Sequence, residues 1–263
     1  MTPLYVAGVG LVASGLPSWS AAVPVLTGVQ AWEAGEIELP SPIMLPKNER
    51  RRASPTIRIA LEAVRQAVEA SGFAPRELPA FFGSSVGDGD VLDVLVRTVT
   101  GGEERVSPTL FHNSVHNAPS GYWSIASGSH APSLSIGAFD ATAAATLLSA
   151  AVQARRQAVL VCIYDAAVPE PLRAVRSITL PFGAALVLSP EPTRSTLARI
   201  AMRLGDRALA PTGLRAPGLA TLLEGNPAAC LLPLLEALAR RQTCEVVIPW
   251  EDAPPLAIAL TPC

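Results

Sequence analysis

Residues 134–155 join a short apolar strand directly to a helix of small residues. The strand is expected over residues 134–138, and the helix over residues 141–155 is almost wholly Ala, Thr, Leu and Ser. A helix with so little polar surface is predicted to be buried. Only Phe139 and Asp140 separate the two elements, so the chain must turn there within a tight elbow. Such a strand, turning into a covering helix, is typical of a layered α/β fold.

Further apolar strands and amphipathic helices alternate along the first two thirds of the chain. Strands are predicted at 4–12, 78–84, 158–165 and 182–188, with helices at 54–70 and 90–100. Strands that alternate with helices indicate a parallel α/β sheet covered on both faces.

The chain changes character beyond Pro192. A strand at 197–203, a helix at 228–241 and a hairpin of 244–250 with 256–260 are expected there. We therefore predict a larger unit over residues 1–192. Residues 193–263 are predicted to form a shortened C-terminal extension packed on it.

Charge and hydropathy exclude several classes of function. The formal net charge of −2 predicts no nucleic-acid partner. No apolar run reaches the ~20 residues of a membrane span, and no secretion signal is visible, so we expect a cytoplasmic protein. The chain is 49% hydrophobic and only 16% charged, which favours a large permanent interface with another protein.

Two motifs could suggest a cofactor or a metal. Residues 8–13 fit a GxGxxA dinucleotide fingerprint, but Ser14–Gly15–Leu16–Pro17 follows instead of a helix, so no cofactor is expected. The four cysteines lack zinc-type spacing and are interpreted as free structural thiols. No metal site is predicted from them.

His112, His116 and Asp140 form the one further candidate for chemistry. On a regular helix the two imidazoles would share a face, and with Asp140 they could form a metal site or an acid/base pair. Prolines nearby argue against such a helix, so we interpret both as hydrogen-bonded structural histidines. Asp140 itself could cap its helix, or it could be a buried carboxylate that needs one of these histidines as a partner.

Five short segments follow one another in a particular order: VAGVGLV at 6–12, GSSVGD at 83–88, RVSP at 105–108, NAPSG at 117–121 and APS at 131–133. Together they resemble the motifs of the β-ketoacyl synthase family, of the thiolase-like fold, over roughly residues 3–190. The resemblance aligns Asp140, without gaps after residues 131–133, with the nucleophilic cysteine of the family.

Two departures from the family decide the function that the resemblance implies. A carboxylate at position 140 cannot form the acyl thioester needed for condensation. The later half of the family supplies two histidines, whereas no histidine follows His130 here. The chain therefore resembles a non-catalytic subunit of the chain-length-factor type, as in polyketide, aryl polyene or fatty-acid-like biosynthesis. One complete α/β/α half with an abbreviated second half is expected.

The resemblance also implies partners and site residues. The expected partners are a full-length ketosynthase in a heterodimer, an acyl carrier protein, and an acyl chain in a shared tunnel. Val86 would line the tunnel and Leu110 would reach toward the partner's pocket. The complete set of expected tunnel and interface residues is Val86, Leu110, Phe111, His112, His116, Asn117, Phe139 and Asp140.

Two other functions stay open from the sequence. One is an independent acyl-transfer or decarboxylating enzyme that uses Asp140 with His112 or His116. The other is an acyl-carrier-binding module without control of chain length, in which the basic cluster at 47–52 would bind an acidic partner.

Overall fold

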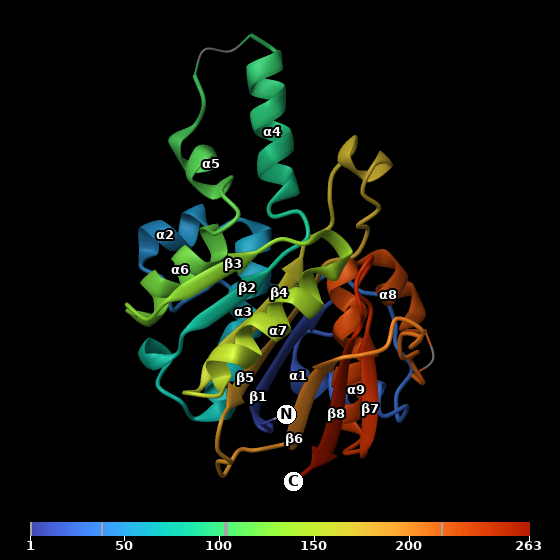
Figure 1. Ribbon diagram of the computed structural model, residues 1–263. Coiled ribbons are helices and arrows are strands. Elements are labelled where there is room, and N and C mark those ends of the chain that lie inside the picture. Colours follow the sequence, from blue (N-terminus) through green and yellow to red (C-terminus); the bar gives the residue numbers. More distant parts are fainter. Residues whose placement is uncertain (1, 38, 103–104, 217) are drawn as a thin grey trace.

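The computed structural model describes residues 2–37, 39–102, 105–216 and 218–263. Its strands form one eight-stranded sheet in the order β3-β2-β4-β5-β1-β6-β8-β7 (Figure 1). The strands are β1 Leu4–Ala13, β2 Ala80–Gly83, β3 Ser133–Ile136, β4 Val159–Asp165, β5 Phe182–Ser189, β6 Ala198–Leu204, β7 Cys244–Ile248 and β8 Leu256–Pro262.

The helices are α1 Trp19–Leu26, α2 Lys47–Arg52, α3 Pro55–Ser71, α4 Gly89–Thr100, α5 Pro108–Asn113, α6 Ala118–Ser127, α7 Thr142–Ala154, α8 Ala220–Gly225 and α9 Leu232–Ala239. Four short 3₁₀ turns are η1 Pro75–Glu77, η2 Phe139–Ala141, η3 Leu172–Ala174 and η4 Pro227–Leu231. The longest helices and the strands lie within a few residues of the predicted positions. None of the described helices is long and apolar enough to cross a membrane.

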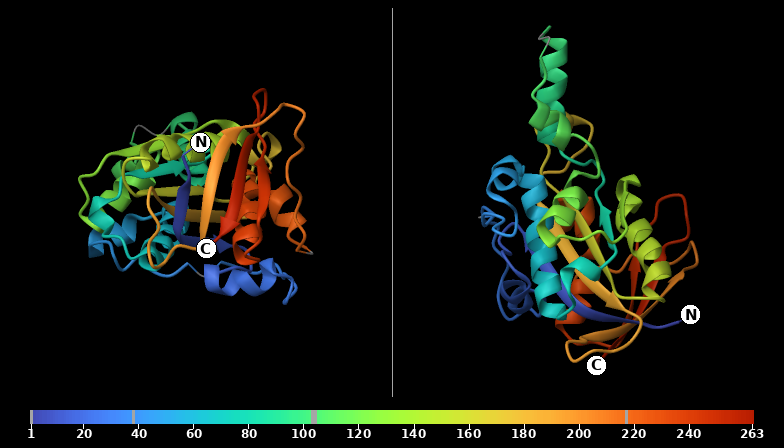
Figure 2. Two further views of the ribbon diagram at one scale, coloured as in Figure 1. Left: turned by 60° about the horizontal axis from the view of Figure 1, so that its bottom comes forward. Right: turned by 90° about the vertical axis from the view of Figure 1, so that its left-hand side faces the viewer.

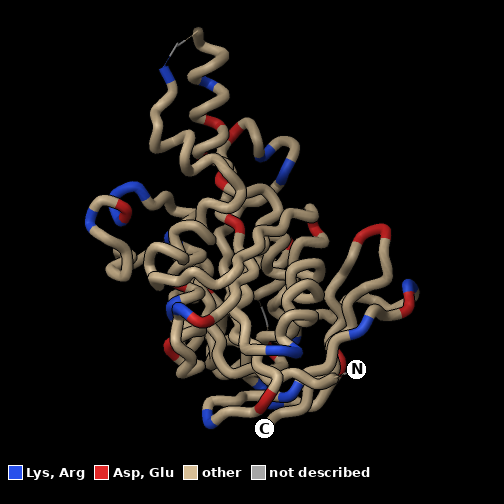
Figure 3. Tube along the Cα trace, turned by 60° about the vertical axis from the view of Figure 1, so that its left-hand side comes forward, with Lys and Arg blue, Asp and Glu red and all other residues tan. Residues whose placement is uncertain are grey.

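The sheet has helices on both faces, as predicted (Figure 2). Alternate residues of the central strands pack against α3 and α6 on one face. The opposite residues pack against α1, α7, η4 and α9. Charged residues are sparse along the trace and lie mostly in loops and at the ends of elements (Figure 3). The apolar content of the chain therefore goes largely into these two layers of core.

The prediction of a parallel sheet is wrong for most of the strands. Only β2 runs parallel to its neighbours, β3 and β4. All other strand pairs are antiparallel. A parallel neighbour requires a crossover connection, usually a helix. The chain instead returns from β4 to β5 through residues 166–181, whose one regular element is the short turn η3.

The sheet continues from β1 into the C-terminal residues. β6 pairs with β1 over Leu4–Val6, and β8 and β7 extend the sheet beyond it. The buried and exposed positions of β6 alternate, so Arg199 and Arg203 lie on an uncovered face. The sheet is therefore covered by helices on both faces from β3 to β1, but on one face only at β6, β8 and β7. The domain boundary near residue 192 stays a prediction.

The glycines of the GxGxxA motif allow a helix to approach β1 closely. A Cβ atom on Gly8 would lie 2.1 Å from the carbonyl oxygen of Ala67, and one on Gly10 would lie 1.9 Å from that of Ala63. Both carbonyls belong to α3, which crosses β1 at this point. The motif therefore serves helix–strand packing, and the next helix, α1, begins only at Trp19, after residues 14–18, rather than within the motif as a dinucleotide fingerprint requires.

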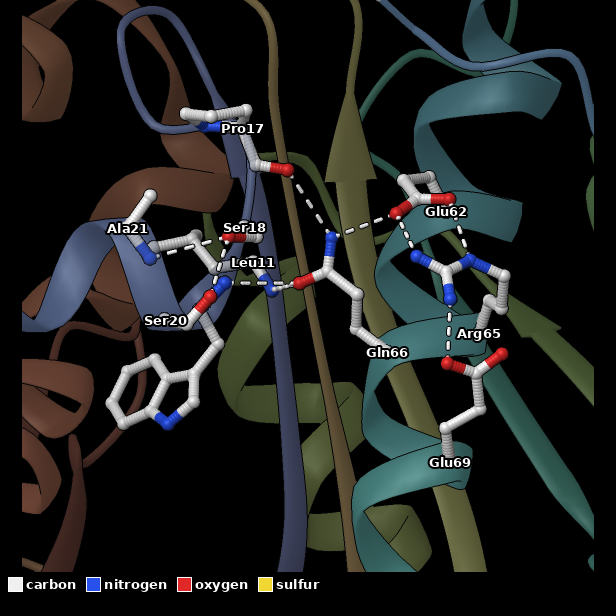
Figure 4. A network of polar contacts seen from close by, with 10 residues as sticks. Leu11, Pro17, Ser18, Ser20, Ala21, Glu62, Arg65, Gln66 and Glu69 are labelled. Atoms are coloured by element: carbon white, nitrogen blue, oxygen red, sulfur yellow. Dashed lines mark hydrogen bonds and ion pairs between the residues drawn. The ribbon is translucent and has the colours of Figure 1, made fainter.

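A polar network ties the loop after β1 to α3 (Figure 4). The Gln66 side-chain oxygen accepts hydrogen bonds from the amides of Leu11 and Trp19, at 3.2 and 3.0 Å. Its amide nitrogen donates to the Pro17 carbonyl and to Glu62. Because one side chain satisfies three backbone groups, the loop is fixed without secondary structure of its own.

Helix α4 stands away from the body, with α5 beside it (Figures 1 and 2). Asp88 caps its first turn by accepting a hydrogen bond from the amide of Val91. Leu92, Val96 and Val99 are exposed on one side of α4, at the spacing of a single helix face. This projecting apolar surface is unusual for a monomer.

Candidate functional site

The elbow between β3 and α7 has a constrained backbone. Phe139 adopts a left-handed conformation with φ of 50°, which is unfavourable for a residue with a bulky side chain. The Thr142 hydroxyl holds this turn, because it accepts from the amide of Ala138 at 2.9 Å and donates to the carbonyl of Phe139 at 2.6 Å. As a result, the Phe139 side chain points outward and is 69% exposed.

Asp140 differs from both interpretations of the sequence. Its side chain is 54% exposed, although the helix that follows is buried as predicted. Its carboxylate forms an ion pair with Arg176 at 2.5 Å, so the prediction of a buried carboxylate paired with a histidine is wrong. Neither η2 nor α7 has a side-chain cap in the described structure, so Asp140 does not cap its helix either. The partner arginine comes from the irregular loop after β4, which no sequence periodicity could place.

Arg176 contacts the elbow in two ways and borders a cavity. Its guanidinium carbon lies 4.8 Å from the centre of the Phe139 ring, in cation–π geometry. Asp140 and Arg176 both line a cavity of about 450 Å³. The other walls come from residues 177–178, the loop after β6, α8, η4, α9 and the end of β7, and they include Cys230.

Cys162 and Cys230 do not have the properties of nucleophiles. Burial raises the pKa of the Cys230 thiol to about 12 and raises that of Cys162 further. A thiolate is the reactive form of cysteine, so burial keeps the reactivity of both thiols low near neutral pH in the folded structure. Cys162 packs between β4 and α3, with its sulfur near the carbonyl of Ala60.

The two histidines are held by different partners. The His116 Nε2 atom lies 2.9 Å from the carbonyl oxygen of Ser84; since a carbonyl can only accept, Nε2 carries the proton. His112 lies 3.2 Å from the Asn113 side-chain oxygen and packs edge-to-face on Tyr122. Both imidazoles are hydrogen-bonded, as predicted. They do not share a helix face, because α5 ends at Asn113.

The other expected tunnel and interface residues differ in their exposure. Val86, in the loop after β2, and Leu110, in the first turn of α5, are half-buried. Phe111 and Asn117 are exposed. Among the described residues, no group of three His, Cys, Asp or Glu side chains is placed to hold a metal ion.

Asp165 is a polar residue of this region that the sequence does not reveal. It is the last residue of β4, and its side chain is fully buried. Its carboxylate accepts hydrogen bonds from the Ser84 hydroxyl at 2.6 Å, the Ser85 hydroxyl at 2.8 Å and the Ser85 amide at 2.9 Å. Burial raises the pKa of Asp165, while these hydrogen bonds oppose the shift.

The Asp165 network fixes the loop that carries Val86. Ser84 donates to Asp165 and accepts from the Gly87 amide at 2.8 Å. Asn226 donates to the carbonyl oxygen of Asp165, which connects the network to η4. The loop after β2, His116 and the end of β4 therefore form one hydrogen-bonded unit. The sequence shows only an apolar strand that ends in an aspartate, and this pattern does not predict the hydrogen-bonded unit.

The family of the chain follows from a match over most of its length. The family model described as the β-ketoacyl synthase N-terminal domain matches residues 28–242. This chain belongs to the β-ketoacyl synthase family. The match includes the elbow, both histidines and the loop after β2. No curated protein matches the sequence.

Solved structures share the fold at low sequence identity. A ketosynthase (ApeO) in complex with its chain length factor (ApeC) from Xenorhabdus doucetiae includes a chain with a TM-score of 0.70 and 19% identity; the match covers 98% of this chain and 100% of that one. The ishigamide ketosynthase/chain length factor gives a TM-score of 0.71 at 12% identity, covering 100% and 99%. A β-ketoacyl synthase from Burkholderia phymatum gives 0.61 at 14% identity, covering 92% and 71%. The thiolase-like ketosynthase fold expected from the sequence is thereby confirmed.

Proposed function

We propose that this chain is a non-catalytic ketosynthase-like subunit that pairs with an active β-ketoacyl-ACP synthase and shapes its acyl tunnel. The observation that carries the proposal is the Asp140–Arg176 ion pair. The resemblance aligns Asp140 with the family's nucleophile, and the carboxylate at this position is paired with Arg176. Such a group offers neither a thiol for acyl transfer nor a free base.

The absence of later histidines supports the same conclusion. No histidine follows His130 in the sequence. The alternative enzyme would need Asp140 to act with His112 or His116. Both imidazoles are engaged elsewhere, by Asn113 and by the Ser84 carbonyl. We therefore favour a subunit without chemistry of its own.

The edge of the sheet supports pairing with another subunit. Among the described strands, β3 lies at one edge of the sheet and pairs with β2 alone. An uncovered strand edge presents unpaired backbone groups to a second chain. Large apolar side chains are exposed on this strand and in the elbow that follows it, namely Leu134 and Phe139. We propose that a ketosynthase covers this edge. Matches to ketosynthase–chain length factor complexes agree with that partner.

The proposed tunnel residues follow from the same arrangement. Val86 would line the acyl tunnel, and Leu110 would reach into the partner's pocket. The Asp165 network would keep the Val86 loop rigid. A rigid apolar wall limits chain length by side-chain volume, and one methylene is worth ~1–3 kcal/mol. Control of length would thus be preferential.

An acyl carrier protein is proposed as the second partner. The solved complex of AntDE with the acyl-carrier protein AntF contains a chain of the same fold, with a TM-score of 0.73 at 13% identity. Helix α2 has no buried residue and carries Arg50, Arg51 and Arg52 at its end. This positive charge would bind an acidic carrier protein. Products of the polyketide or aryl polyene type are consistent with such a complex.

Reconstitution with a ketosynthase tests the proposed function. The chain is expected to co-purify with that ketosynthase, and the complex should extend acyl chains that the ketosynthase alone does not. In the complex, Val86→Phe should shorten the main product, whereas Val29→Phe, an exposed substitution near α1, should not. A chain that stays monomeric beside the ketosynthase and leaves its products unchanged would contradict the proposal.

A further inference from the structure

The Asp140–Arg176 ion pair connects two walls of the cavity beside the elbow, here called the elbow cavity. Asp140 comes from the elbow, whereas Arg176 comes from residues 166–178 of the loop after β4, here called the strap. Arg176, Ser177 and Ile178 of the strap line the cavity of about 450 Å³. The ion pair thus spans the border between the strap and the body of the protein.

The strap is anchored at its base and lightly held elsewhere. The Val168 amide donates to the carbonyl oxygen of Ile178 at 2.9 Å, which closes the base. Arg97 of α4 donates to the Glu170 carbonyl at 3.1 Å. Val175, next to Arg176, is almost wholly exposed. With few apolar contacts at its tip, the strap is a segment that can open locally.

Arg176 makes the contacts that hold the strap to the elbow. Its side chain is only 18% exposed, yet its Nε atom has no hydrogen-bond partner in the described structure. Its guanidinium donates to the Asp140 carboxylate and lies over the Phe139 ring, 4.8 Å from the ring centre. The left-handed backbone of Phe139 places that ring outside the core, where it can meet the guanidinium.

We propose that the Asp140–Arg176 pair is a latch that holds the strap closed over the elbow cavity. The carboxylate at position 140 then has a conformational role, which goes beyond pairing with a ketosynthase and does not depend on it. Releasing the latch should expose the cavity wall opposite the strap. Cys230 lies on that wall and is 9% exposed in the closed form.

The reactivity of Cys230 toward a small maleimide reports on the latch. Cys244→Ser and Cys263→Ser remove the two cysteines that are at least partly exposed, leaving Cys230 and the core thiol Cys162. Peptide mass spectrometry after timed labelling gives a rate for each. Asp140→Asn removes the ion pair and should raise the Cys230 rate roughly two- to fivefold. Arg176→Gln also removes the ring contact and should raise it by about tenfold.

The pair of variants also tests whether the two residues act together. The double variant Asp140→Asn, Arg176→Gln should label no faster than Arg176→Gln alone, because both changes break one contact. Arg203→Gln, which breaks the separate Arg203–Glu245 pair, should leave the rate unchanged.

Three results would overturn the latch. The first is an unchanged Cys230 rate in both single variants. The second is multiplication of the single effects in the double variant. The third is labelling of Cys162 in step with Cys230, because Cys162 is wholly buried and reacts only on global unfolding. Reconstitution with a ketosynthase plays no part in this measurement, so failure of the latch and failure of the proposed function are separate results.

Discussion

The Asp165 carboxylate and the Ser84 hydroxyl are joined by a buried hydrogen bond of 2.6 Å. The two residues are 81 positions apart in the sequence, at the ends of neighbouring strands β4 and β2. This contact decides how the chain leaves β2 and therefore where the loop with Val86 lies.

Asp165→Asn is expected to destabilise the protein by about 1–3 kcal/mol. The asparagine side chain has one acceptor oxygen instead of two, so it cannot accept all the hydrogen bonds from the two serine hydroxyls and the Ser85 backbone N–H. Urea unfolding followed by circular dichroism measures this change. Asp206→Asn is the control, because Asp206 is exposed and accepts one hydrogen bond from the Ala208 amide. Its effect should stay within about 0.5 kcal/mol. Equal effects of the two variants would contradict a special role for Asp165.

The stability contributed by Asp165 should also depend on pH. Burial raises its pKa in the folded state above the unfolded value near ~3.9. The folded state therefore binds the proton more tightly, and this contribution is fully present below the unfolded pKa. It is lost as pH rises through the folded pKa. The wild-type free energy of unfolding, relative to Asp165→Asn, should thus fall as the pH rises from about 4 through the folded-state pKa. A rise over this range would show that the hydrogen bonds outweigh burial.

Gly10→Ala should prevent α3 from packing on β1. The new methyl group would lie 1.9 Å from the Ala63 carbonyl oxygen, which belongs to helix backbone and cannot move aside. We expect a loss of about 3 kcal/mol or more, seen as insoluble protein or a much lower melting temperature. Gly121→Ala in α6 is the matched control, because nothing lies within 4 Å of its added methyl group. It should be neutral or stabilising by up to about 1 kcal/mol.

Leu134→Lys on the β3 edge should weaken association with the ketosynthase. A lysine on an uncovered strand edge opposes pairing with another chain, and it also removes an exposed apolar contact. Co-purification should fall at least ~10-fold, as expected for a contact worth more than about 1.4 kcal/mol. Val29→Lys, exposed in the loop after α1, should not change it. Equal recovery of both variants would argue that the partner binds elsewhere.

Asp140→Cys is not expected to restore condensation. The new thiol would stand where the resemblance predicts the family's nucleophile, but no histidine follows His130 to activate decarboxylation. An assay with a malonyl-loaded carrier protein should show no condensation above the wild-type level. Acylation of the new thiol without condensation would agree with this view, whereas turnover would contradict it.

Much of the fold follows from local patterns in the sequence. The helix α3 is specified by Ser54 at its N-cap, Pro55 in its first turn, one apolar face and the left-handed Gly72 at its end. The strand–elbow–helix order and the lack of histidines after His130 can likewise be read directly, whereas the alignment of Asp140 with the family's nucleophile stays a prediction. These features depend on residue type and spacing within a few positions, which the sequence states explicitly.

Strand direction, the partner of Asp140 and the role of Asp165 required the tertiary structure. Each depends on contacts between distant segments: Asp140 with Arg176, 36 residues apart, and Asp165 with Ser84. The strap that carries Arg176 has no hydrophobic period, so nothing local predicts where it crosses the elbow. The sequence alone determined that the elbow carries Asp140 and no cysteine. Only the folded chain placed Arg176 against this carboxylate, because long-range packing decides which charges meet.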